Sequence, residues 1–81
     1  MNYVPNVLDI LKNILQGVDI ASDISYHQSC QQIMNSYLLP WQKELCINQL
    51  TIQHSKQKNF IMTEKFLFDL SNLIDDISNK K

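Results

Sequence analysis

The stretch VLDILKNILQGV occupies residues 7–18 of the sequence. Its apolar residues recur at steps of three and four, so on a helix they cover about 160° of the circumference. Polar residues take the opposite side. Pro5 suits the first turn of a helix, and Gly17 suits the left-handed position just after a helix end. The stretch therefore predicts an amphipathic helix from Pro5 to Gln16.

A second stretch of this kind lies at residues 66–77. Its apolar residues form one stripe: Phe66, Leu67, Leu70, Leu73, Ile74 and Ile77. Phe68 is the exception, because it falls about 200° from Phe66 around a helix and so faces away from whatever covers the stripe. Asn59 or Thr63 can cap this helix. We therefore expect a helix here whose outer side carries an exposed phenylalanine.

Two further helices are expected between these stretches. The first begins after a cap at Asp19, Ser22 or Asp23 and ends near residue 38, because the residue before a proline disfavours helical angles. Pro40 then opens the next helix, which runs to residue 56 or 58. The polar run 53–59 is either a loop after this helix or a stretch that joins it to the last helix.

The helix opened by Pro40 has apolar residues on two sides. Trp41, Leu45 and Ile52 cluster within about 40° on a helix. Cys46, Ile47 and Leu50 lie about 140–240° around from them. Such a helix needs apolar neighbours on both sides, and one of these neighbours can be another chain.

Composition agrees with one small helical domain. The chain has 81 residues, an apolar fraction of 44% and a net charge of -1, which is ordinary for a folded protein. One glycine and two prolines leave too few turn residues for a β-sandwich or barrel. We expect an all-α fold, a small antiparallel three- or four-helix bundle over residues 1–81. More than half of it should be helical, with a frayed tail at 79–81.

Two histidines and two cysteines are the residues whose types suggest a zinc site: His27, Cys30, Cys46 and His54. Cys46 and His54 are eight residues apart, about 12 Å along a helix, which is too far for both to reach one ion. We read both thiols as unlinked core residues. A chain with a single glycine also lacks a glycine-rich loop for an oxyanion or phosphate. We expect no catalytic residue, no cofactor, no metal and no enzymatic activity.

The lysines offer an alternative function. Lys43, Lys56 and Lys58 follow Pro40 and could contact phosphates from the second helix of a helix-turn-helix. The usual turn contains glycine and spans three to four residues, which the corner at Pro40 does not match. All seven basic residues are lysine, so the chain lacks the arginine fork suited to phosphate and guanine. A small DNA-binding regulator is therefore the alternative reading, and nucleic acid is not the expected partner.

The expected function is binding to another protein. We expect Trp41 and Tyr37 to anchor the partner because tryptophan and tyrosine are favoured at interfaces, and Phe68 because it lies off the main stripe of its helix. Ile47 and Leu50, on the second apolar side of their helix, would support the contact. A core position that closes the end of the bundle is the alternative for Trp41. The class would be an inhibitor, an immunity-like or antitoxin-like protein, a chaperone or an adaptor, acting by steric occlusion or scaffolding through an apolar helix face. The partner can be a second copy of the chain.

The expected location is the cytoplasm, with no membrane partner. No run approaches the ~18–20 consecutive apolar residues of a membrane span. The amino terminus also lacks the basic-then-apolar order of a signal peptide.

Overall fold

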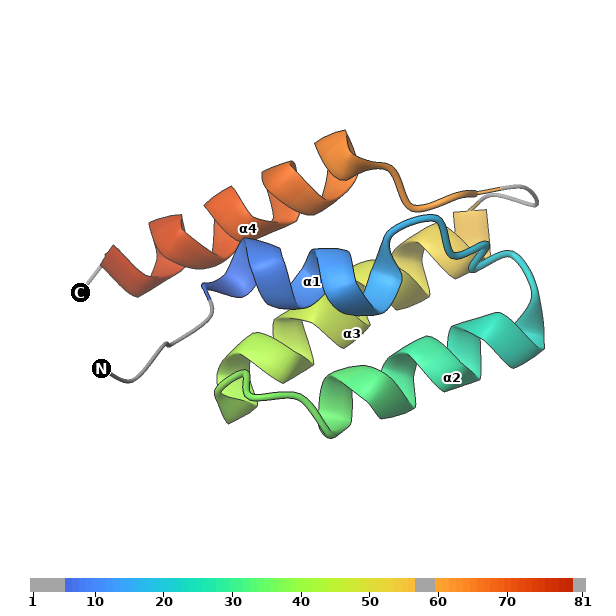
Figure 1. Ribbon diagram of the computed structural model, residues 1–81, viewed down its shortest axis with the longest axis horizontal. Coiled ribbons are helices and arrows are strands. Elements are labelled where there is room, and N and C mark those ends of the chain that lie inside the picture. The colour runs from blue at the N-terminus through green and yellow to red at the C-terminus, as the bar shows by residue number, and fades with distance from the viewer. Residues whose placement is uncertain (1–5, 57–59, 80–81) are drawn as a thin grey trace.

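Four helices make up most of the chain that the structure describes. The computed structural model describes residues 6–56 and 60–79. The helices are α1 (Val7–Leu15), α2 (Asp23–Met34), α3 (Pro40–Lys56) and α4 (Glu64–Asn79). Successive helices run in opposite directions (Figure 1). Helices account for 76% of the described residues, which confirms the predicted all-α fold and gives the bundle four helices.

Polar side chains fix where three of these helices begin. The side chains of Asn6, Ser22 and Thr63 each accept a hydrogen bond from the backbone N–H three residues later. Each bond satisfies one of the N–H groups that a helix start leaves without an internal partner. Ser22 and Thr63 are therefore the caps among the predicted alternatives. Pro5, predicted to lie in the first turn of α1, is outside the described residues.

The polar run 53–59 is divided between a helix and a connection. Residues 53–56 are the last turn of α3, and α4 begins only at Glu64. Residues 57–59 lie outside the described residues, as does the predicted helix end at Lys58. Because α3 and α4 run in opposite directions (Figure 1), they are two helices and not one rod.

The core lies between two closely packed pairs of helices. α1 packs chiefly against α4, and α2 packs chiefly against α3. The core is apolar and draws on all four helices and on the connections: Ile10, Leu11, Leu15, Ile20, Ile33, Leu38, Cys46, Leu50, Met62, Leu67, Leu70 and Ile74. Burying this set supplies the main stabilising free energy of a chain this small.

The stripe predicted for α4 is only partly buried. Leu67, Leu70 and Ile74 are in the core, but Leu73 and Ile77 remain about two-fifths exposed. α4 packs much more closely against α1 than against α3, so its flank toward α3 stays uncovered. The prediction that this whole stripe faces inward is therefore wrong for its α3 flank.

The frayed tail predicted at 79–81 does not include its first residue. Asn79 is the last residue of α4 and is helical. Lys80 and Lys81 lie outside the described residues.

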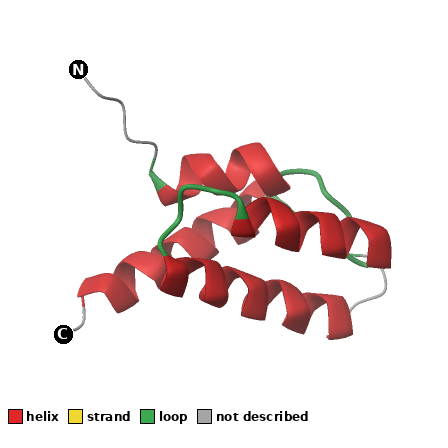
Figure 2. Ribbon diagram, turned by 90° about the horizontal axis from the view of Figure 1, so that it is seen from below, coloured by secondary structure: helices red, strands yellow, loops and turns green. Residues whose placement is uncertain are grey.

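Two connections pair with each other at one end of the bundle. The N–H of Gly17 donates to the Met62 carbonyl (3.0 Å), and the N–H of Met62 donates to the Val18 carbonyl (2.9 Å). The N–H of Ile20 donates to the Phe60 carbonyl (3.1 Å). Figures 1 and 2 show both connections at one end, while the start of α1 and the end of α4 lie at the other. The segment between α1 and α2 is thus tied to the segment before α4.

Gly17 makes the first of these connections possible. Its φ is 81°, in the left-handed region that glycine adopts without strain. This conformation turns the chain out of α1 and directs the Gly17 N–H to Met62. The prediction of a left-handed glycine after the first helix is confirmed.

Candidate partner-binding surface

α3 turns one of its two apolar sides into the core. Cys46 and Leu50 are completely buried and Ile47 is half-buried, whereas Trp41 is 37% exposed and Ile52 is also exposed. Leu50 was predicted to support a partner, but it has no surface to offer because it packs in the core. The sequence showed that α3 is apolar on two sides, and the structure shows which side remains uncovered.

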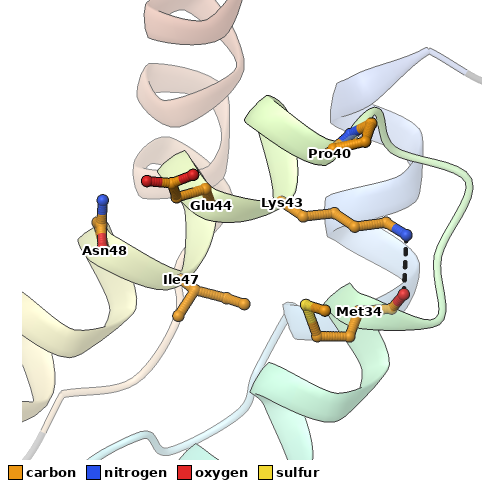
Figure 3. A pocket seen from close by; sticks show the side chains of 6 residues that line it. All are labelled: Met34, Pro40, Lys43, Glu44, Ile47 and Asn48. Atoms are coloured by element: carbon orange, nitrogen blue, oxygen red, sulfur yellow. Dashed lines mark hydrogen bonds between the residues drawn. The ribbon is translucent and has the colours of Figure 1, made fainter.

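A pocket of about 430 Å³ lies on the α2 side of α3 (Figure 3). Its lining is Met34, Pro40, Lys43, Glu44, Ile47 and Asn48. The Lys43 amino group donates a hydrogen bond to the Met34 backbone carbonyl (2.8 Å), at the carboxyl end of α2 where carbonyls lack helical partners. Lys43 therefore caps α2 from across the turn, and its aliphatic stem lines the pocket.

A second hollow, of about 260 Å³, lies on the α4 side of α3. Trp41 and Leu45 of α3 and Ile77 of α4 form its apolar lining, and Glu44 and Asn48 complete it. The uncovered flank of α4 thus faces the uncovered side of α3.

Glu44 and Asn48 line both hollows, so these two residues form a ridge between them, here called the α3 ridge. Both residues are exposed. Within the described chain, the Glu44 carboxylate takes part in no hydrogen bond or ion pair. The outer face of α3 therefore presents two apolar hollows separated by a polar ridge with an unpaired negative charge.

The five predicted contact residues do not form one surface. Trp41 and Ile47 come together on the outer face of α3, one in each hollow. Tyr37 is 90% exposed at the corner between α2 and α3 and lines a different pocket, together with Ile10 and Ile14 of α1.

Phe68 lies on yet another face. It is 51% exposed, as its position on the helix predicted. Ile77 follows Phe68 by nine residues, which places the two about 180° apart around α4. Since Ile77 faces α3, Phe68 is on the flank of α4 away from Trp41. Its predicted role as a partner contact therefore concerns a separate surface.

Sequence reasoning missed the ridge and the α4 side of this surface. Glu44 and Asn48 look like any polar residues of a solvated helix, and Ile77 looks like a core residue. The one available signal was that Trp41 and Leu45 fall on a different side of the helix from Cys46. That signal led to the prediction that one apolar side of this helix can face another chain, but it did not show which side.

His54 holds the end of α3 against the start of α2. In its doubly protonated form, Nδ1 donates to the Ile20 carbonyl (2.7 Å) and Nε2 to the Asp23 carboxylate (3.0 Å). The ring also stacks on Tyr26, with centroids 4.2 Å apart. Both nitrogens are thus engaged in contacts within the fold, and His54 is explained by its structural role.

The two cysteines are free thiols in different environments. Cys46 is completely buried, and burial raises the pKa of its thiol to about 12. Burial also raises the pKa of Cys30, which is partly exposed, and a hydrogen bond from Tyr26 opposes that rise. Neither environment favours the thiolate that nucleophilic or metal-binding chemistry requires. Among residues 6–56 and 60–79, no three metal-ligating side chains gather at one place.

No protein-family model, curated protein or solved structure matches this chain. Within the described ranges, none of the helices combines the length and apolar character needed to cross a bilayer. The two apolar hollows make the outer face of α3 the surface from which we infer a function.

Proposed function

We propose that this protein is a small helical binding module that docks a partner protein on the outer face of α3. Docking would act by steric occlusion or by scaffolding, since the surface offers a partner mainly apolar contact area. The observation that carries the proposal is the pair of apolar hollows on either side of the α3 ridge. Small-molecule sites are concave and mostly apolar, and the centre of a protein–protein interface is enriched in aromatic residues and methionine.

Trp41 is the strongest single contact on this surface. A tryptophan side chain can bury roughly 250 Å², so an exposed fraction of 37% leaves on the order of 90 Å² for a partner to cover. At about 25 cal/mol per Å², covering this area contributes about 2 kcal/mol. That is the size of effect expected of an energetically dominant interface residue.

The helix directions and the charges around α3 do not favour the alternative function, DNA binding. α2 and α3 run side by side in opposite directions (Figure 1), whereas the helices of a helix-turn-helix cross at about 90–120°. Lys43 donates its hydrogen bond to Met34, and Glu44 places a negative charge on the outer face of α3. Lys56 is exposed at the far end of α3, and Lys58 lies outside the described residues.

A site-specific cross-linking experiment tests the proposal. A photoreactive phenylalanine analogue is placed at Asn48 on the α3 ridge, and in a matched control at Asp75, which is exposed on α4. We expect irradiation in an extract of the native cell to give a defined covalent adduct from position 48 and none from position 75. Adding Trp41→Ala should remove this adduct while the far-ultraviolet circular dichroism spectrum stays helical.

No adduct from position 48, or an adduct that survives Trp41→Ala, would show that the outer face of α3 is not the docking surface. An adduct from position 75 alone would place docking on the flank of α4 that carries Phe68, because Asp75 and Phe68 are seven residues apart and share one side of the helix. Binding to duplex DNA that weakens steeply as salt rises would instead support the DNA-binding alternative.

A further inference from the structure

We propose that the docked partner presents an amphipathic helix that crosses α3 and carries a cationic side chain between two apolar ones. This inference rests on the proposed function, because it specifies the chemistry of the partner for the same surface. It follows from the spacing of the two hollows and from the charge on the ridge.

The spacing favours a helix. The two hollows lie on opposite sides of α3 and share Glu44 and Asn48. An α-helix with its side chains is about 10 Å across, so side chains that fill both hollows must stand about 10 Å apart. Residues i and i+7 of a helix lie on one face about 10.5 Å apart, and residue i+3 or i+4 lies between them. On one face of a strand the available separations are about 7 and 13 Å, which match less well.

The charge of the surface determines which charge the partner's side chain between its two apolar residues must carry. Glu44 stands on the ridge between the hollows, and Asp69 lines the continuation of the groove between α3 and α4. Of the residues that the structure describes, Lys43 is the one cation that lines either hollow, and its amino group already donates to Met34. An apolar or anionic side chain placed over the ridge would leave the Glu44 carboxylate covered without a partner, which opposes binding. Lysine or arginine at i+3 or i+4 would pair with it.

The same charge argues against a second copy of the chain on this surface. In a two-fold symmetric dimer the same patch meets itself. A dimer whose two-fold axis passes at Glu44 would bring the two Glu44 carboxylates together, and like charges that face each other across an interface suppress association.

Designed peptides test the inference directly. The probes are fluorescein-labelled helical peptides of alanine and glutamine that carry Leu, Arg and Leu at positions i, i+4 and i+7. A matched peptide has Glu in place of Arg. We expect the Arg peptide to bind the full-length protein about five- to tenfold more tightly at low salt, as read by fluorescence anisotropy. Glu44→Lys should reverse this preference, and Asp75→Lys, which makes the same charge change elsewhere, should leave it in place.

The outcomes separate this inference from the proposed function. If Trp41→Ala weakens both peptides but Glu44→Lys leaves their ranking unchanged, the surface still docks a helix and the cationic partner is wrong. If neither peptide binds while position 48 still gives its Trp41-dependent adduct, the function stands and the helical partner is wrong. A wild-type dimer in light scattering that Trp41→Ala dissociates would show that the occupant is a second copy, and would overturn the inference.

Discussion

Replacing Gly17 by alanine should destabilise the protein through its backbone alone. Gly17 has a φ of 81°, and a methyl group added to it would meet no atom within 4 Å. Its N–H donates to the Met62 carbonyl, and alanine keeps that donor. The substitution therefore changes the backbone preference of one residue without a steric clash and without losing a hydrogen bond.

The expected cost is about 1 kcal/mol. Holding an alanine in the left-handed region costs roughly 1–2 kcal/mol. The smaller freedom of alanine in the unfolded chain returns about 0.4–1 kcal/mol. Asparagine tolerates the left-handed region better, so Gly17→Asn should cost less than about half as much. For a chain of this length, 1 kcal/mol lowers Tm by about 4–8 °C.

Urea and thermal unfolding, followed by far-ultraviolet circular dichroism, measure both variants. Gln16→Ala is the matched control, because Gln16 is exposed and has an ordinary φ of -59°. That control should lie within about 0.5 kcal/mol of the wild type. If Gly17→Ala is as stable as the wild type, or if the alanine and asparagine variants lose the same free energy, then Gly17 does not hold the left-handed conformation in solution. The backbone pairing with Met62 would then need another explanation.

Three further predictions concern single side chains. His54→Ala should lower the free energy of unfolding by about 1–3 kcal/mol, because it leaves the buried Ile20 carbonyl without its donor; unchanged stability in urea would contradict this. At about pH 8, iodoacetamide should modify Cys30 faster than Cys46, since the thiolate is the reacting form and burial raises the pKa of Cys46 to about 12; equal rates in mass spectrometry would show that Cys46 is accessible. Phe68→Asp should keep the helical circular dichroism spectrum, because Phe68 is half exposed; loss of helicity would mean that the ring is buried. The substitution should reduce association only if the flank of α4 that carries Phe68 is itself an interface.

The sequence predicted the fold where one helix side is distinctly apolar. In α1 and α4 the spacing of residues such as Leu11 and Leu67 leaves one direction for the core, and both are completely buried. In α3 the spacing allows two directions. Residue type does not show whether Cys46 or Trp41 faces the core, because this depends on how closely α2 and α4 approach α3.

The candidate surface could be predicted only in part for the same reason. Trp41 was predicted as a contact residue because tryptophan is common at interfaces, and Ile47 because it lies on a second apolar side of its helix. Glu44 became important only when the structure placed it between two hollows formed with α2 and α4. The pairing of the connections at Val18 and Met62 joins residues far apart in the sequence and carries no local pattern. The position of Glu44 between the hollows and the pairing of Val18 with Met62 both depend on tertiary contacts, which the sequence does not show.

The backbone hydrogen bonds between the α1–α2 connection and the segment before α4 hold α3 and α4 together at one end of the bundle. His54 attaches the last turns of α3 to Ile20, and Met62 attaches the start of α4 to the same connection. From His54 to Trp41, α3 extends about 20 Å. A rotation of about 5° at the fixed end would therefore move Trp41 by about 2 Å relative to Ile77. A rotation of this size would be enough to change the width of the hollow between Trp41 and Ile77.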